Sequence, residues 1–382
     1  MKKIAIITMY FKSTNYGGVL QAYALQELLN QYPNVSATQI KYNMNSGFSS
    51  EYSSKKVTFK KIIKLMHRKQ ESLLYKKNRD YIEQFRNDKI QKFQKFDEKF
   101  IKSSELSYSY EELYSLNKKY DYFICGSDQV WHSINYGYLL DFVENPSGKI
   151  SYAASIARTS LSRKEKEKIS SSLETFNAIS VREASDIFLL KSLTKKEIIH
   201  VLDPTLLLPQ NSWKNICSPK IHKTRYILCY FLGNNKVAKR AAYSFAKSKG
   251  LDIVIIPANI TDLVKKHDNA YSYNASPQEF LSLIKNAEFV FTDSYHCTIF
   301  SIVFQKQFFV YRRNRFDEMI NRVKDLMSIF NIDNRLCPTN AKLNYLNSLQ
   351  AINYVDKKME IFNVLKKNSI KFLETRLQIK AF

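Results

Sequence analysis

The strongest constraint on the fold comes from residues 288 to 304, which read EFVFTDSYHCTIFSIVF. A short apolar run with β character gives way, at a polar hinge, to the apolar spacing of a helix. Asp293 or Ser294 can accept hydrogen bonds from the first free N–H groups of that helix. His296 is therefore expected in the first helical turn, after the carboxyl end of a strand. Ligands bind there in open α/β sheets, and a helix N-terminus favours phosphates and carboxylates.

Strands and helices alternate along most of the chain. Expected strands span residues 3 to 9, 37 to 42, 120 to 125, 149 to 157, 178 to 181 and 198 to 202, then 225 to 232, 252 to 256, 288 to 292 and 307 to 311. The spacing predicts helices over residues 18 to 32, 163 to 176, 236 to 249, 317 to 330 and 356 to 377, and one more that starts at residue 276. We therefore predict an α/β fold of two Rossmann-like domains that face a cleft.

The expected domain boundaries follow from where this alternation fades. Residues 205 to 222 show little pattern, so we place the junction there. The predicted units are a first domain over residues 1 to 210, a second over residues 211 to 350, and a C-terminal helix over residues 351 to 382. Within the first domain, residues 48 to 118 break the alternation and are expected to form an insertion.

This insertion carries much of the unusual charge of the chain. The 382 residues have a formal net charge of +24, and residues 55 to 102 hold 16 basic and 6 acidic side chains. Apolar residues recur between the basic ones at mostly helical spacing, namely Ile82, Phe85, Ile90, Phe93, Phe96 and Phe100. We therefore predict one or two basic amphipathic helices. Their apolar face either packs on the body of the protein or contacts a membrane surface or a polyanionic glycan.

Composition also limits the cellular compartment and the classes of function. The five cysteines have no CxxC spacing, which favours reduced, cytoplasmic thiols over a disulfide or zinc framework. No run approaches the roughly 18 apolar residues of a membrane span. We expect a cytoplasmic protein, and peripheral contact with the inner face of an anionic membrane stays open as the alternative role of the basic insertion. A nucleic-acid-binding or other polyanion-binding protein ranks lower, because the charge clusters on one insertion without a recognition motif.

Six short motifs follow one another along the chain: NYGGVLQA from Asn15, CGSDQVW from Cys125, SYAAS from Ser151, VRE from Val181, LDPT from Leu202 and TDSYH from Thr292. Together they resemble the polysaccharide pyruvyl transferase family over nearly the whole chain, apart from the insertion and the C-terminal tail. The resemblance implies a GT-B-like fold, with the acceptor side in the first domain and the donor side in the second. It also implies transfer of the pyruvyl group of phosphoenolpyruvate to a sugar of a bacterial surface polysaccharide, which forms a ketal.

The candidate catalytic residues are His296 and Asp128. Ketal formation requires a group that both gives and takes protons near neutral pH, and histidine suits this role. The alternative for His296 is a structural role at the helix start. Asp128 follows an expected strand in a Gly-Ser-Asp loop, where it is placed to bind or deprotonate acceptor hydroxyl groups.

Phosphoenolpyruvate carries a carboxylate and a phosphate, so its site needs fixed positive charge, for which arginine is preferred. Family members often have arginine two residues before the histidine, and Ser294 stands in that position here. The expected donor-binding residues are Ser294, Tyr295, Arg182, Arg312, Arg313 and Arg315. A solvated turn is the alternative for the last three arginines, and an ion pair with Glu183 is an alternative for Arg182.

The acceptor is expected to be a glycan, in lipid-linked form if the enzyme works at the membrane. The predicted acceptor-binding residues are Asn15, Tyr16, Gly17 and Trp131, because the first βα loop lines the cleft and a Trp ring can stack on a sugar. Burial in the core is the alternative for Trp131. We expect phosphoenolpyruvate as the donor substrate, with no cofactor and no metal ion, because arginine can neutralise the donor and no ligand cluster is visible.

A second hypothesis is a GT-B-type glycosyltransferase that uses a nucleotide-sugar donor. Such an enzyme needs a carboxylate for the ribose in its second domain. Asp262, Asp268 and Glu279 are available for that role.

Overall fold

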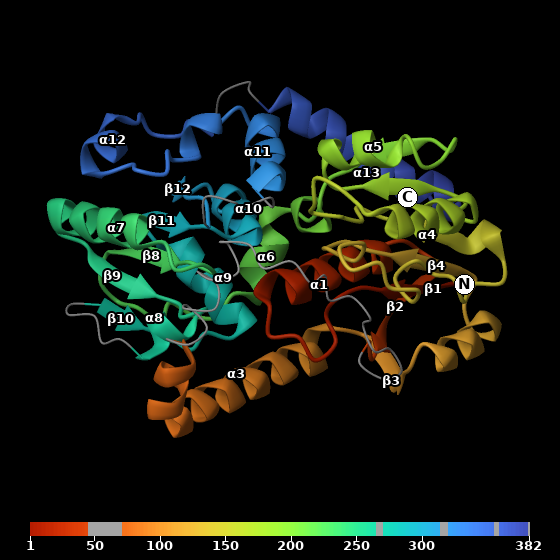
Figure 1. Ribbon diagram of the computed structural model, residues 1–382, viewed down its shortest axis with the longest axis horizontal. Coiled ribbons are helices and arrows are strands. Elements are labelled where there is room, and N and C mark those ends of the chain that lie inside the picture. Colours follow the sequence, from red (N-terminus) through yellow and green to blue (C-terminus); the bar gives the residue numbers. More distant parts are fainter. Residues whose placement is uncertain (45–70, 265–269, 314–319, 355–358, 381–382) are drawn as a thin grey trace.

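The structure is a computed structural model that describes residues 1–44, 71–264, 270–313, 320–354 and 359–380. Two five-stranded parallel sheets lie side by side, one in each half of the chain (Figure 1). The first sheet contains β1 (Lys2–Ile7), β2 (Val35–Tyr42), β3 (Ser103–Tyr108), β4 (Tyr122–Cys125) and β5 (Lys149–Ser151). The second contains β8 (Tyr226–Tyr230), β9 (Asp252–Ile255), β10 (Ala270–Ser272), β11 (Phe289–Thr292) and β12 (Gln307–Val310).

Both sheets have the same strand order. The first runs β3-β2-β1-β4-β5 and the second runs β10-β9-β8-β11-β12. In each sheet the order reverses at the central pair, so the loops after β1 and β4, and those after β8 and β11, flank a crevice of the kind that binds ligands. A two-stranded sheet of β6 (Ile179–Val181) and β7 (Ile198–His200) continues the first sheet beyond β5 through bridges at Ile150 and Ala154.

The helices connect and cover these strands. They are α1 (Tyr16–Asn30), α3 (Arg79–Phe100), α4 (Arg163–Glu174), α5 (Ala184–Leu190), α6 (Gln210–Ile216), α7 (Lys236–Lys249), α8 (Ile260–Val264), α9 (Pro277–Asn286), α10 (Tyr295–Val303), α11 (Ile320–Ile329), α12 (Leu343–Ser348) and α13 (Glu360–Leu377). Short 3-10 helices are η1 (Glu111–Lys118), η2 (Pro146–Gly148), η3 (Pro204–Leu206) and η4 (Asp333–Arg335). The predicted α/β fold of two Rossmann-like domains is confirmed.

Side-chain caps define the two helices that meet at the centre of the molecule. The Asn15 side chain accepts from the backbone N–H of Gly17 at 3.0 Å, which starts α1 directly after the loop that follows β1. The Ser294 side chain accepts from Cys297 N at 3.4 Å and starts α10. Each cap satisfies an N–H group that has no partner within its helix.

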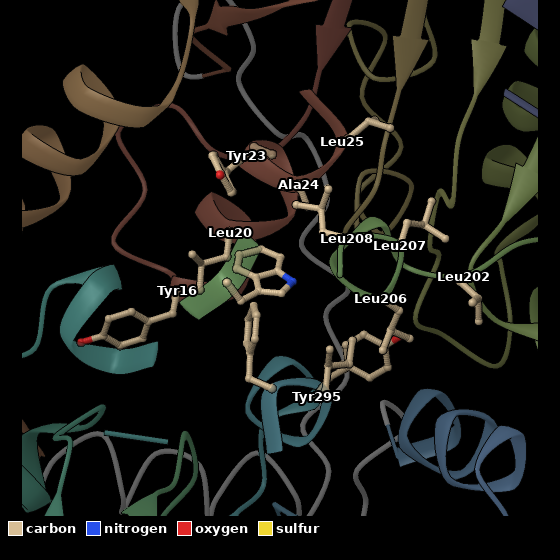
Figure 2. Packing of buried hydrophobic residues seen from close by; sticks show 14 of the residues in the cluster. Tyr16, Leu20, Tyr23, Ala24, Leu25, Leu202, Leu206, Leu207, Leu208 and Tyr295 are labelled. Carbon is tan, nitrogen blue, oxygen red and sulfur yellow. The ribbon is translucent and has the colours of Figure 1, made fainter. Parts of the chain in front are cut away.

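The two domains share a continuous apolar core. Tyr16 on α1 stacks on Phe280 of α9 with ring centroids 4.3 Å apart, and its hydroxyl donates to Ala275 O at 2.6 Å. Figure 2 shows the α1 side chains facing the segment around Leu206, which lies beside Tyr295 of α10. Because this core crosses from one sheet to the other, burial of apolar surface holds the loops of the two sheets against each other.

The C-terminal helix α13 returns to the first domain. Its Phe372 ring lies 6.3 Å from that of Tyr152, and its Ser369 hydroxyl accepts from Leu202 N at 2.9 Å. Lys2 Nζ donates to Leu377 O at 2.7 Å. The last helix of the chain therefore stabilises the domain in which the chain begins.

The insertion differs from the prediction in its second part. Residues 45–70 lie outside the described part of the chain, and α3 follows with Phe93 and Phe96 buried, so its apolar face packs on the body. After α3, however, the chain forms β3, which pairs with β2 at the sheet edge, and then η1. The prediction of helix to residue 118 was wrong there, because pairing with an open sheet edge decided a short segment whose own pattern was weak.

The insertion also reaches the second domain. Lys92 Nζ of α3 donates to Asn274 O at 2.6 Å, and Asn274 Nδ2 donates to Asp88 Oδ2 of α3 at 2.7 Å. Figure 1 shows α3 running past both sheets on one side of the molecule. This helix therefore bridges the two domains.

Candidate active site

His296 lies where the two domains meet. It occupies the first turn of α10, and its side chain is only 8% exposed. Its Nε2 is 3.3 Å from Asp203 Oδ2, a contact that is an ion pair when the imidazole is protonated. The opposite side of the ring touches Gly17 on α1, where an added Cβ would overlap Nδ1. The imidazole is thus held between one residue after β7 and one at the start of α1.

Asp203 connects His296 to the first domain. Its Oδ2 accepts from Arg182 Nη1 at 2.9 Å and from Ser127 Oγ at 3.2 Å, while its Oδ1 accepts from Thr205 N at 3.0 Å. Burial alone would raise the pKa of Asp203, but His296 and the Arg182 guanidinium hold it well below its ordinary value. Asp203 is therefore an anion that can orient His296 and stabilise a positive charge on its ring.

Arg182 is fully buried beside this carboxylate. Its Nε donates to Glu183 Oε1 at 2.9 Å, so the ion pair considered as an alternative is present. Its guanidinium carbon lies 4.5 Å from the centroid of the Tyr295 ring, and its Nη1 is 3.8 Å from Asp128 Oδ1. Its Nη2 is buried and donates to no described protein atom. Arg182 therefore orients Asp203 and retains one unsatisfied donor.

Asp128 approaches from the loop after β4. Its backbone is left-handed, with φ of 70°, a conformation that Asp adopts more readily than most residues. A Cβ built on Gly18 would lie 3.4 Å from Asp128 Oδ2, so this carboxylate faces the first turn of α1. The structure thus brings together His296, Gly17, Tyr295, Arg182 and Asp128 from the predicted set.

Arg322 lies beside this site, and sequence reasoning did not select it. It lies on α11, is 8% exposed, and places its guanidinium carbon 5.4 Å from the centroid of the Tyr295 ring. Burial and the neighbouring Arg182 lower the pKa of Arg322. No motif marks this position, since it lies within an ordinary amphipathic helix. Asp203 was also missed, although it stands in the LDPT motif.

The other predicted donor-binding residues take different positions. Ser294 is a buried helix cap, and Arg313 Nε lies 3.9 Å from Asp293 Oδ2. Arg312 is partly buried, and its carbonyl accepts from Asn235 Nδ2 at 2.9 Å. Arg315 lies outside the described residues. Among these three arginines, the structure describes a side-chain contact with the β11–α10 loop for Arg313.

Two of the predicted acceptor-binding side chains have structural positions instead. Trp131 is 0% exposed, and its Nε1 donates to Tyr138 O at 3.2 Å, so its ring presents no surface to a sugar. The Tyr16 ring is buried between the domains, as described above. Both corrections have one cause, which is that large aromatic side chains contribute most when they are buried. Asn15 is exposed at the cap of α1.

The carboxylates considered for a nucleotide ribose are engaged in local contacts. Asp262 forms an ion pair with Lys239 and accepts from Asn259 Nδ2 at 2.8 Å. Glu279 closes the capping box of α9 by accepting from Ser276 N at 2.7 Å. Asp268 lies outside the described residues. Both described carboxylates therefore have local partners already.

Within the described ranges, no group of three or more His, Cys, Asp or Glu side chains is arranged to hold a metal ion. Among the helices described, none has the length and apolar character needed to cross a bilayer. The expectation that the enzyme needs no metal stays a prediction.

Comparison with protein families matches residues 15–315 to the model of the polysaccharide pyruvyl transferases. The chain belongs to the polysaccharide pyruvyl transferase family. Membership makes it a transferase that acts on a polysaccharide, and the family resemblance seen in the six motifs is confirmed. Comparison with curated protein sequences finds no match.

Comparison with solved structures finds proteins of similar fold at low sequence identity. The S. aureus MnaA–UDP complex superimposes with a TM-score of 0.53 at 12% identity, covering 99% of this chain and 97% of the other. A structure from Listeria monocytogenes, described as a UDP-N-acetylglucosamine 2-epimerase, gives a TM-score of 0.56 at 11% identity over 99% and 97% of the chains. These likenesses show a GT-B-type fold alone.

Proposed function

We propose that this member of the family transfers the pyruvyl group of phosphoenolpyruvate to two hydroxyl groups of one sugar, forming a ketal, with His296 as general acid and base. The observation that carries the proposal is the pair of buried arginines at the N-terminus of α10. Arg182 and Arg322 both lie against the ring of Tyr295, the residue before His296. Two guanidinium groups beside a helix N-terminus suit a ligand with a carboxylate and a phosphate.

The same arginines explain how the site works with Ser294. The unsatisfied Nη2 of Arg182 offers a hydrogen bond to an anion, and Arg322 adds a second positive charge from α11. Ser294 itself is buried, and its hydroxyl is engaged in capping the helix. We propose that Arg182, Arg322 and Arg313 together bind the donor.

The proposed reaction has two bond-forming steps. His296 gives a proton to the methylene carbon of phosphoenolpyruvate while the first sugar hydroxyl attacks C2, and the proton of that hydroxyl returns to the imidazole or to Asp128. The second hydroxyl then attacks C2, the C–O bond to phosphate breaks, and the proton of that hydroxyl leaves with the phosphate. The products are the ketal and inorganic phosphate, with no cofactor or metal ion.

The imidazole must turn for this chemistry. In the structure Nε2 faces Asp203 and Nδ1 lies against Gly17. Catalytic hydrogen bonds commonly reach their working geometry only when substrates bind. We propose that donor binding draws the ring away from Gly17, while the Asp203 carboxylate stabilises its protonated form.

The test is calorimetric titration of the full-length protein with phosphoenolpyruvate, alongside a panel of UDP-sugars. We expect phosphoenolpyruvate to bind and Arg322→Met to weaken binding by about tenfold to a hundredfold, the loss of one charge-assisted contact. Arg240→Met, an exposed arginine on α7, is the matched control and should change nothing. His296→Ala should keep donor binding but lower phosphate release by about 10²- to 10⁴-fold. Binding of a UDP-sugar in place of phosphoenolpyruvate would contradict the proposal.

A further inference from the structure

A cavity lies beside α3, apart from the residues that hold His296. Its volume is about 370 Å³, within the range of small-molecule sites. One wall is α3, and the opposite wall is the segment from Pro257 to Leu263 that follows β9 and enters α8. Lys12 and Thr14, in the loop between β1 and α1, complete the lining.

The lining combines apolar surface with positive charge. Ile82, Phe85 and Leu263 contribute apolar side chains, and Lys12, Arg86 and Lys89 contribute cations. Among the described residues that line the cavity none is acidic, although Arg86 pairs with Glu83 at 2.9 Å beside it. A site of this composition complements a ligand that has both a negative group and a hydrocarbon part.

Lys89 is the least solvent-exposed of the three cations that line the cavity. Its Nζ lies 4.7 Å from the centroid of the Tyr16 ring and 5.6 Å from that of Phe93, and it forms no ion pair within the described residues. Burial lowers the pKa of this amine to about 8. A partly desolvated cation without a carboxylate partner gains most from an incoming anion.

The cavity is next to the site of chemistry. Thr14 lines it, Asn15 caps α1, and Gly17 touches the His296 ring, so the cavity and the imidazole lie close to the same turn of chain. The Tyr16 ring, which carries Lys89 on its face, belongs to that turn. A ligand anchored in the cavity is therefore held near the loop expected to face the acceptor.

We propose that this cavity binds the phosphate-bearing end of the hydrocarbon anchor of a lipid-linked glycan acceptor. The phosphate lies against Lys89 and Lys12, and the first hydrocarbon units lie against Ile82, Phe85 and Leu263. The inference rests on the proposed function, because it identifies the acceptor of that reaction. It also assigns the basic helix α3 a specific ligand in addition to general attraction to anionic lipid.

The test uses farnesyl phosphate, farnesol and inorganic phosphate as separate probes, titrated into the full-length protein below the aggregation range of the amphiphiles. We expect farnesyl phosphate to bind at least about tenfold more tightly than either part alone, because it satisfies both the cation and the apolar wall. Lys89→Met should weaken its binding by about tenfold. Lys95→Met, an exposed lysine on the same helix, is the matched control and should leave binding unchanged.

A second variant, Leu263→Glu, introduces a negative charge on the opposite wall and should weaken farnesyl phosphate binding as well. Equal binding by wild type and Lys89→Met, or binding of inorganic phosphate or farnesol as tight as that of farnesyl phosphate, would overturn the proposal. Phosphoenolpyruvate is titrated into the same proteins and should bind Lys89→Met as it binds wild type. If farnesyl phosphate binds as expected but phosphoenolpyruvate does not bind, the proposed reaction is wrong and the proposed site for the amphiphile is still supported.

Discussion

At the scale of single residues, the contact between Gly17 and His296 leaves no room for a larger side chain. Gly17→Ala would place a Cβ inside the imidazole ring, so the ring or the start of α1 must move. We expect Gly17→Ala to lower pyruvyl transfer by at least about tenfold, because displacements near 1 Å at a reacting group carry costs of that size or more. Phosphate release in the presence of glycan acceptor measures the effect.

The double variant Gly17→Ala/His296→Ala provides the control for that prediction. Removing the imidazole removes the overlap, so the double variant should recover much of the thermal stability lost in Gly17→Ala. Independent, additive losses in a double-mutant cycle would mean that the two residues are not coupled and that the contact is unimportant.

Asp203 gives a prediction that depends on pH. Its pKa is held below the ordinary value, chiefly by His296 against the opposing effect of burial, so its stabilising contribution is complete above about pH 4 and is lost as pH falls through the lower folded value. Asp203→Asn should lower the free energy of unfolding at pH 7 by about 3 kcal/mol. The difference in free energy of unfolding between wild type and Asp203→Asn should become smaller as pH falls below 4. Urea unfolding at several pH values measures this, and a gap that stays constant with pH would contradict it.

At the scale of elements, α3 carries a carboxyl group that opposes its packing. Burial, with the neighbouring Glu98, raises the pKa of Asp97 to about 7, and its Oδ1 is buried without a hydrogen-bond partner among the described residues. Because the folded state favours the protonated carboxyl group, the protein is most stable at low pH. This contribution to the free energy of unfolding is lost as pH rises through 7. Asp97→Asn should therefore raise the free energy of unfolding by about 2 kcal/mol at pH 8 and have little effect at pH 4.

Thermal unfolding at pH 4 and pH 8 measures the Asp97→Asn effect. Glu144→Gln, an exposed carboxylate of the first domain, is the control and should show no such difference between the two pH values. Destabilisation by Asp97→Asn at pH 8 would mean that the charged carboxylate has a favourable partner.

At the scale of the whole molecule, Tyr16 links the two domains. Tyr16→Phe removes the hydrogen bond to Ala275 O and should lower the free energy of unfolding by about 1 to 2 kcal/mol. Tyr16→Ala also removes the stack on Phe280 and should cost about 3 to 5 kcal/mol. Denaturant unfolding measures both, and Tyr81→Ala, an exposed tyrosine on α3, should have almost no effect. Losses equal to that of Tyr81→Ala would show that the interface contributes little.

The alternation of strands and helices could be predicted from the sequence, because strands and helices differ in the period of their apolar residues and helices have capping residues. The strand before His296, the Ser294 cap and the parallel character of the buried strands all depend on neighbours in sequence. The six motifs indicated the protein family. Within the candidate site, the position of His296 at a strand end followed from local pattern alone.

Other features were decided by contacts between distant residues. Asp203 meets His296 from 93 positions away, Arg322 reaches Tyr295 from another helix, and Trp131 and Tyr16 are buried because tertiary packing favours large aromatic rings inside. β3 forms because an open sheet edge was available to it. Apart from β3 and η1, the sequence alone determined the main strands and helices, their order and the family, since these depend on local periodicity and motifs. Only the tertiary structure decided which charges face one another, because Coulomb and packing energies depend on distances that no spacing in the chain specifies.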